Sequence, residues 1–176
     1  LGGVLQRQGK FDEAVDAFQR SYDLLVKVDD QRGQAMVLNS LGGVLQRQGK
    51  FDEAVDALQR SIAIGKQLRD RRHLAMAHTT LGGIYQSQQK LEGAVTQFLD
   101  AFHIDESLKN RRGMKIITPN LVKCLSELNR RDEALDICRR ALIVAPGNNR
   151  ISRLQTSLSA TRETTNQAET KTGIVK

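Results

Sequence analysis

The sequence predicts an all-α protein, built as a solenoid of stacked helix hairpins. The 176-residue chain repeats itself every forty residues, and residues 1–21 and 41–61 differ only at Phe18 and Leu58. A period of this length is typical of stacked repeat arrays. The chain has no Trp, and aromatic residues make up only 4% of it, which suits closely packed helices better than sheets. We therefore expect almost no strand.

Each forty-residue copy contains two apolar blocks with helical spacing, separated by a short polar turn. In the second copy the apolar residues of the two blocks are Met36, Leu38, Leu41, Val44 and Leu45, then Phe51, Ala54, Val55, Leu58, Ile62 and Ile64. Apolar residues that recur every three or four positions indicate one buried face of a helix. The repeat unit is therefore a helical hairpin.

The turn inside each hairpin is expected to need a positive φ angle. Gly9 and Gly49 occupy it in the first two copies, and Gln89 and Asn129 take their place later. Glycine adopts this conformation without a steric penalty, asparagine tolerates it and glutamine does so less well. The acidic pairs 12–13 and 52–53 follow the turn, where they complement the dipole at the start of the second helix.

The links between hairpins pair a capping residue with arginine. Asp30, Asp70 and Asn110 each precede the next helix, whose first residues include Arg in all three cases. N-terminal capping and local ion pairing explain this pattern. A rim of arginines that binds acidic ligands is the functional alternative, because arginine suits carboxylates and phosphates.

The array is expected to end before residue 161. Repeats are predicted at 1–40, with a truncated first helix, and at 41–80, 81–120 and 121–147. Pro146 and Gly147 stop the last hairpin, and Ile151, Leu154 and Leu158 then predict a capping helix over about 148–160. Residues 161–176 have almost nothing to bury, so we expect a disordered tail. Because the chain begins at Leu1 in the middle of a repeat, we expect it to be a fragment of a longer protein.

The hairpins resemble the tetratricopeptide repeat (TPR) family, whose pattern is W-x2-L-G-x2-Y, A-x3-F and P. The matching residues are Leu41, Gly42 and Leu45; Leu81, Gly82 and Tyr85; Ala14, Ala54, Ala94 and Ala134; and Phe18, Leu58, Phe98 and Cys138. The match covers residues 1 to about 146. It implies a right-handed superhelix of antiparallel helix pairs, with about three and a half to four repeats and a C-terminal capping helix.

Some positions depart from the family pattern. The Trp position holds Leu38, His78 and Thr118, and Val122 replaces glycine in the fourth copy. The forty-residue period is similar to that of kinesin light chains, GoLoco-binding polarity adaptors and many bacterial signalling proteins. Residues 68–77 resemble arrays attached to bacterial signalling NTPases, although the chain has no G-x-x-x-x-G-K-[ST] phosphate loop.

The resemblance implies a concave groove lined by the first helix of each hairpin. The residues that it assigns to the groove are Gln6, Arg7, Met36, Asn39, Ser40, Gly43, Gln46, Arg47, Met76, Thr79, Gly83, Gln86, Asn120, Lys123 and Glu127, with Gly3 and Ser87 beside them. Relatives that clamp a peptide backbone carry an asparagine where Gly43 and Gly83 stand, so that clamp is missing here.

Two features of this groove suggest how it works. Gly3, Gly43 and Gly83 each cost a helix roughly 1 kcal/mol relative to alanine, so we expect them to serve either helix contact or an open groove floor. Arg7, Arg47 and Lys123 are predicted to hold the carboxylates of an acidic peptide or of a carboxy terminus.

Pro119 conflicts with the helical pattern of the fourth copy, because it removes a backbone donor inside a first helix. That helix must either kink or restart near Thr118, and we predict a bend between Met114 and Pro119.

Composition limits the function classes. The net charge of +7 mildly favours acidic partners, although we expect the charges to be mixed along every helix. Cys124 and Cys138 fall at apolar repeat positions and are read as core thiols in a reduced, intracellular protein. The three histidines share no helix face, and no Ser, His or Cys, His pairing is suggested by position, so we predict neither an enzyme nor a cofactor or metal site. No apolar run approaches the roughly 20 residues of a membrane span.

The sequence thus predicts a cytoplasmic protein–protein interaction module that belongs to a larger signalling or regulatory protein of bacterial type. Self-assembly is the first alternative, because Leu1, Leu5 and Phe11 lie at an edge without a polar cap. A nucleic-acid binder is the second and weaker one, since base-reading or stacking residues are scarce.

Overall fold

The structure is a computed structural model that describes the backbone of residues 1–172 and the side chains of residues 1–160. Within those residues every regular element is an α-helix, which confirms the all-α prediction. The chain divides into two compact units, Leu1–Ile104 and Asp105–Lys176, and each is described by itself below.

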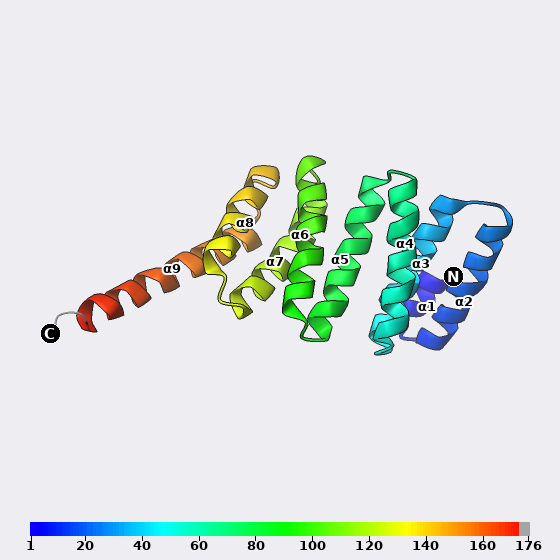
Figure 1. Cartoon of the computed structure of the whole chain (residues 1–176), viewed down its shortest axis with the longest axis horizontal. Helices are drawn as coiled ribbons and strands as arrows, with labels where there is room; N and C mark the ends of the chain where they lie inside the picture. Colours follow the sequence, from blue (N-terminus) through cyan, green and yellow to red (C-terminus); the bar gives the residue numbers. More distant parts are fainter. Residues whose placement is uncertain (173–176) are drawn as a thin grey trace. The chain divides into compact units, whose positions relative to one another are not determined.

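The first unit is a stack of helix hairpins (Figure 1). Its helices are α1 (Gly2–Arg7), α2 (Phe11–Lys27), α3 (Gln31–Arg47), α4 (Phe51–Gln67), α5 (Arg71–Ser87) and α6 (Leu91–Ser107), the last of which runs into the second unit. Helices α2 to α6 are each 17 residues long, whereas α1 has six. Consecutive helices from α1 to α5 pack against one another. The predicted hairpin unit is therefore confirmed.

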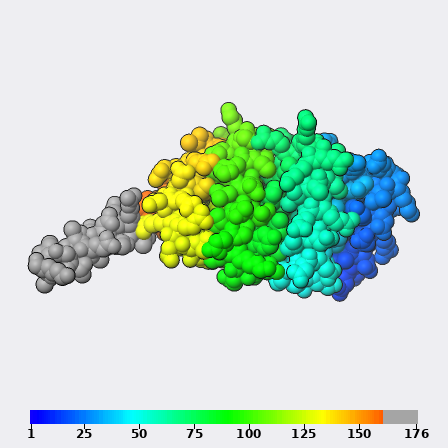
Figure 2. All heavy atoms as spheres, in the orientation of Figure 1, coloured from blue at the N-terminus to red at the C-terminus, as the bar shows by residue number. Residues whose placement is uncertain are grey.

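The core of the first unit consists of aliphatic side chains from α3, α4 and α5. Leu38, Leu45, Leu58 and Ile84 are buried in one cluster. Side chains fill the space that separates the ribbons of these helices (Figure 2). Burial of this apolar surface provides the main favourable free energy for stacking one hairpin on the next.

The predicted caps at the hairpin links form. Asp30 accepts a hydrogen bond from the backbone N–H of Gly33, and Asp70 accepts one from His73. In the second unit, Asn110 caps α7 through the N–H of Gly113. Each cap satisfies one of the backbone donors that a helix start leaves without an intrahelical partner.

The turns inside the hairpins have the expected positive φ. Gly9 and Gly49 both have φ of 76°, and Gln89 and Asn129 have φ of 59° and 57°. The links between hairpins also contain a left-handed residue, Asp29, Arg69 or Lys109. The sequence did not reveal these positions, because no glycine or asparagine marks them.

The second unit contains α7 (Arg111–Glu127), α8 (Arg131–Val144) and α9 (Asn149–Thr172). Helix α7 packs on α8, and α9 packs on both. Ile151 of α9 is fully buried there. The backbone of α9 is helical to Thr172, beyond the expected end near residue 160. A disordered tail was predicted for residues 161–176. The side chains of residues 161–172 and all of residues 173–176 lie outside the described residues.

Pro119 lies inside a single continuous helix, α7. The alternative of a restart near Thr118 is therefore excluded, while the predicted bend between Met114 and Pro119 stays a prediction. Proline removes one backbone donor, which leaves the carbonyl of Lys115 without its usual helical partner. Lys115 is exposed, so water can replace that hydrogen bond.

Candidate interaction surface

The residues predicted to line a groove all lie on the first helix of a hairpin. Those of the first unit, with Gly3 and Ser87 included, are named here the first-helix strip, and Asn120, Lys123 and Glu127 lie on α7 of the second unit. None of them is buried. Met36 and Met76 are large apolar residues that are 58% and 56% exposed.

Hydrogen bonds connect successive hairpins along the strip. Gln46 Nε2 donates to Ser87 Oγ over 3.1 Å, and Ser87 Oγ donates to the carbonyl of Gly83 over 2.9 Å. A Cβ on Gly83 would lie 3.7 Å from Gln46 Nε2, and a Cβ on Gly43 would lie 3.9 Å from Gln6 Nε2. The glutamine of one hairpin thus lies beside the open glycine of the next, so the structure brings these residues of α1, α3 and α5 together.

Adjacent glycines in the same helix serve different purposes. A Cβ on Gly42 would lie 2.7 Å from Leu58 Cγ, and one on Gly82 would lie 2.7 Å from the ring of Phe98. Gly43 and Gly83 have only the glutamine amides nearby, at ordinary contact distances. Helix contact therefore explains Gly42 and Gly82, whereas Gly43 and Gly83 leave backbone open on the strip.

Within the helices of the first unit, acidic side chains are confined to the second helix of each hairpin, whereas basic residues occur on both helices, with Lys27 on α2 and Lys66 on α4. Helices α1, α3 and α5 contain five arginines and no Asp or Glu, whereas the acidic side chains of this unit's helices all lie on α2, α4 and α6. The arginines are Arg7, Arg32, Arg47, Arg71 and Arg72; the acidic residues are Asp12, Glu13, Asp16, Asp23, Asp52, Glu53, Asp56, Glu92 and Asp100. The expectation that charges are mixed along every helix is therefore wrong.

In the second unit, acidic residues are not fully confined to the second helix of the hairpin. Helix α7 has four basic residues and one acidic one, Glu127, whose carboxylate lies 3.8 Å from Lys123 Nζ. The hydrophobic pattern of the sequence does not reveal this distribution of charge. The distribution becomes visible only when charges are counted helix by helix.

Arg7 and Arg47 are exposed cations on the strip. Each lies in the last turn of its helix, where positive charge complements the helix dipole. In the described part of the chain neither side chain lies within ion-pair distance of a carboxylate. By contrast, Arg32 Nε lies 3.4 Å from Asp70 Oδ2.

Arginines at the hairpin links have structural roles, as their contacts show. In the second unit, Arg111 Nε donates to the carbonyl of Val144, the last residue of α8. Arg140 does not lie at a link but on α8, where it forms an ion pair with Glu106 through two N–O contacts of 2.9 and 2.6 Å. These contacts favour capping and ion pairing over a rim that is free to bind acidic ligands.

A buried Ser–His contact was missed by the sequence reasoning, which suggested no such pairing. Ser61 Oγ donates to the carbonyl of Ala35 over 2.9 Å and lies 2.7 Å from His73 Nε2. Because the hydroxyl proton is already donated, Nε2 must carry the proton in this hydrogen bond, so the imidazole cannot act as a base toward Ser61. Burial lowers the pKa of His73, an effect that the nearby Asp70 carboxylate opposes. The pair is a structural link between α4 and α5.

Cys124 and Cys138 are free, fully buried thiols of the second unit. Burial raises the pKa of Cys138 to about 11 and is also the main cause of the raised pKa of Cys124. Both thiols are therefore protonated at neutral pH, which makes them poor nucleophiles.

Metal-binding clusters and membrane-spanning helices are both absent from the described residues. No cluster of three or more His, Cys, Asp or Glu side chains with metal-binding geometry occurs among them. None of the helices combines the length and apolar character that crossing a bilayer requires.

Comparison with known proteins identifies the fold family. The tetratricopeptide repeat model matches residues 1–67 and 33–107, which together cover more than half of the chain. The chain belongs to the tetratricopeptide repeat family. No curated protein sequence matches it. TPR arrays generally act as protein–protein interaction scaffolds and are typically not enzymes.

Solved structures agree on the TPR fold. BtubC (BKLC) from P. vanneervenii has a TM-score of 0.77 at 16% identity, with 97% of this chain and 73% of that chain covered. A kinesin light chain-like protein of P. anserina with nearly identical TPR-like repeats has a TM-score of 0.75 at 15% identity, with 96% and 87% covered. MamA has a TM-score of 0.65 at 17% identity, with 93% and 85% covered. Identities this low support the fold alone.

Proposed function

We propose that this TPR array binds an acidic segment of a partner protein along the first-helix strip. The observation that carries the proposal is the distribution of charge: the strip offers Arg7 and Arg47 without a carboxylate partner in the described residues, on helices that have no acidic side chain. Paired arginines favour carboxylates, which they bind through charge-assisted hydrogen bonds.

The other side chains of the strip support a peptide as the ligand. The open backbone at Gly43 and Gly83 leaves room for close approach of another chain. Met36 and Met76 offer flexible apolar contacts, which suit varied partner side chains. Neighbouring amides and hydroxyls, such as Gln46 and Ser87, provide further hydrogen-bonding groups on the strip.

The proposal is tested by reversing the two cations. We expect Arg7→Glu, Arg47→Glu to weaken binding of an acidic peptide, selected from a library of Asp/Glu-rich sequences, by at least tenfold in a fluorescence anisotropy titration. The matched control is Lys27→Glu, Lys66→Glu, because these exposed lysines also lie in the last turns of helices, but on α2 and α4. Each pair of substitutions changes net charge and helix-dipole interactions equally.

The titration has three outcomes that support or contradict the proposal. Loss of binding only in the strip variant supports the proposal. Equal loss in both variants would indicate attraction by net charge alone, and unchanged affinity in the strip variant would exclude Arg7 and Arg47 as the site. Circular dichroism of each variant checks that the helices are retained.

Self-association is the second candidate function, favoured by one specific observation. The first hairpin exposes the apolar side chains of Leu1, Leu24 and Val28 at one edge. A homo-oligomer that packs through this edge would bury them. Light scattering over a range of concentrations tests this, and a constant monomer mass would exclude it.

The proposed setting is the cytoplasm, within a larger signalling or regulatory protein. Two free thiols buried in one unit fit a reducing compartment. Fractionation of cells that express the tagged chain would test the location.

A further inference from the structure

A cavity at the end of α8 belongs to the second unit and shares no residue with the first-helix strip. It has a volume of about 450 Å³, which lies within the range of pockets that bind small ligands. Its walls come from the last turn of α6, the link after it, the start of α7 and the end of α8, and we name it the α8-end cavity. The lining residues are Glu106, Lys109, Arg111, Arg140, Ile143 and Val144, all within the second unit.

The cavity lies where α8 ends early. Helix α8 has 14 residues, whereas α2, α4 and α6 have 17. Pro146 explains the early end, because proline has no backbone N–H to donate and disfavours a helical conformation at the residue before it. Ile143, in the last turn of α8, is 81% exposed. Its equivalents in the earlier hairpins are Asp23, Ala63 and His103, so this exposed aliphatic wall is particular to the fourth hairpin.

Two of the charged side chains in the lining neutralise each other. Arg140 Nε and Nη2 donate to the two carboxylate oxygens of Glu106. Arg140 Nη1 also lies 3.6 Å from Asp136 Oδ2. The carboxylate of Glu106 therefore leaves the other cations of the cavity without compensation.

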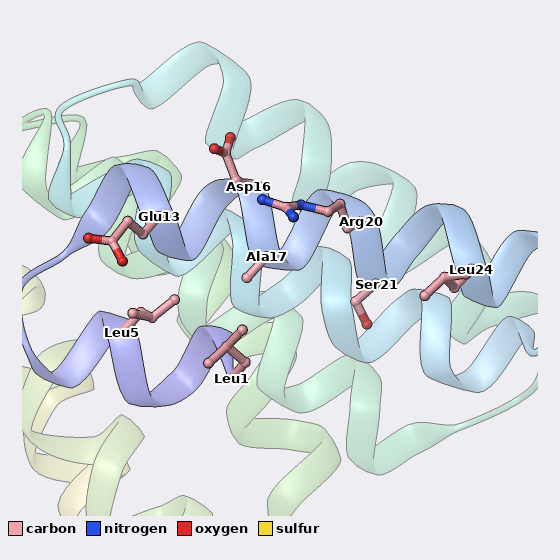
Figure 3. Close-up of a pocket in the computed structure, with 8 residues that line it drawn as sticks. All are labelled: Leu1, Leu5, Glu13, Asp16, Ala17, Arg20, Ser21 and Leu24. Carbon is pink, nitrogen blue, oxygen red and sulfur yellow. The ribbon is translucent and has the colours of Figure 1, made fainter.

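Lys109 and Arg111 are these other cations. Both are exposed, and no carboxylate of the described residues lies within ion-pair distance of either one. The bond from Arg111 to the last carbonyl of α8 uses Nε, so Nη1 and Nη2 remain for a ligand. By contrast, the hollow between α1 and α2 has the carboxylates of Glu13 and Asp16 on its walls together with Arg20 (Figure 3). The α8-end cavity thus offers two positive charges next to an aliphatic surface.

We propose that the α8-end cavity binds a phosphate monoester that carries an aliphatic group. A phosphate monoester has a charge of about −1.5 to −2 at neutral pH, so one group can neutralise both Lys109 and Arg111. Its oxygens suit the paired Nη donors of an arginine, and the lysine adds a second point charge. Ile143 and Val144 cover the aliphatic group and remove it from water. A single carboxylate would neutralise only one of the two cations.

The test compares probes by isothermal titration calorimetry with the full chain. The phosphate monoester could be a phosphoserine beside leucine in a partner protein or a small alkyl phosphate, so the probes include acetyl-Leu-pSer-Leu-amide and butyl phosphate. We expect saturable binding of at least one of them, and the tighter of the two identifies the source. The unphosphorylated peptide and glutarate, which has two carboxylates, should bind at least tenfold more weakly.

Lys109→Asn tests the cations with little risk to the fold. Position 109 has φ of 50°, a conformation that asparagine tolerates. We expect this variant to weaken binding of the tighter probe by about tenfold. Arg69→Asn is the matched control, because Arg69 is exposed at the same position of the preceding link with φ of 52°. It changes the net charge equally and should leave binding unchanged.

Ile143→Asn tests the aliphatic wall separately from the charges. Because this side chain is mostly exposed, its loss should not unfold the second unit. We expect severalfold weaker binding of the tighter probe and unchanged binding of inorganic phosphate, which has no aliphatic group.

The proposal is overturned if neither phosphate ester binds the folded chain, or if glutarate or the unphosphorylated peptide binds as tightly. Equal weakening by Lys109→Asn and Arg69→Asn would also overturn it, because attraction would then depend on net charge alone. Unchanged binding of the tighter probe to Ile143→Asn would exclude the aliphatic contact. Circular dichroism of each variant checks that the helices are retained.

Discussion

At the residue scale, helix packing in each hairpin depends on one small residue and one large residue opposite each other. The first three copies pair a glycine of the first helix with Phe or Leu of the second, as in Gly42 with Leu58. In the fourth copy Val122 and Cys138 occupy the equivalent positions, and both are buried. In this copy the larger side chain therefore lies on the first helix. The volume between the two helices is kept, as close packing requires.

Gly82 and Gly83 provide a sharp test, because adjacent substitutions should change stability in opposite directions. Gly82→Ala places a Cβ 2.7 Å from the ring of Phe98, so we expect it to lower the free energy of unfolding by about 1–3 kcal/mol. Gly83→Ala meets no backbone and should raise it by up to about 1 kcal/mol through helix propensity. Urea denaturation followed by circular dichroism measures both. Equal destabilisation by the two variants would show that Gly83 is also a packing residue.

At the element scale, α6 has a buried carboxylate near its end, whereas the equivalent positions of the other hairpins have uncharged residues. Asp105 is 2% exposed, and Leu25, Gly65 and Ala145 occupy its equivalent positions. Its Oδ1 accepts a hydrogen bond of 2.7 Å from Asn110 Nδ2, so it contacts the residue that caps α7. Burial raises the pKa of Asp105, while that hydrogen bond lowers it in part. The negative end of the α6 dipole further disfavours a carboxylate there.

We expect Asp105→Ala to stabilise the second unit at pH 7, because it removes the cost of burying a carboxylate. The gain should shrink as the pH falls toward the raised pKa of Asp105, because the folded parent chain then binds a proton there. Hydrogen exchange of α7 and α8 amides measures the effect. Asp16→Ala, which removes an exposed carboxylate from α2, is the control for helix propensity. A loss of protection at pH 7 would mean that the Asn110 contact outweighs the cost of the buried charge.

At the scale of the whole molecule, most of the fold could be predicted from the forty-residue repeat. The features that could not be predicted are contacts between side chains of different repeats. Apolar spacing predicted every hairpin, and Asp30 and Asp70 predicted their caps. The Ser61–His73 contact was not predicted, because it joins neighbouring hairpins whose other copies lack histidine at that position. The candidate strip came from family resemblance alone. Its open glycines and its distribution of charge required the helix bounds and the neighbours of each residue.

Each unit contains a buried titratable group with a shifted pKa. The two shifts have opposite effects on how stability changes as the pH falls. Burial lowers the pKa of His73 in the first unit below its ordinary 6.5. As the pH falls through 6.5, the unfolded state binds the proton first, so the first unit loses stability. Burial raises the pKa of Asp105 in the second unit above 3.8. As the pH falls toward 3.8, the folded state binds the proton first, so the second unit gains stability.

We therefore expect mild acid to destabilise the first unit selectively. Between pH 7 and 5, amide protection in α4 and α5, corrected for intrinsic exchange rates, should fall by at most about 1.4 kcal/mol per pH unit for one proton. Protection in α7 and α8 should not fall for this reason and should rise as the pH falls through the raised pKa of Asp105. His73→Gln keeps a donor toward Ser61 but cannot titrate, so it should remove the loss in the first unit. If His73→Gln and the parent chain lose protection in parallel, the pH response belongs to other groups, and the buried imidazole is not its source.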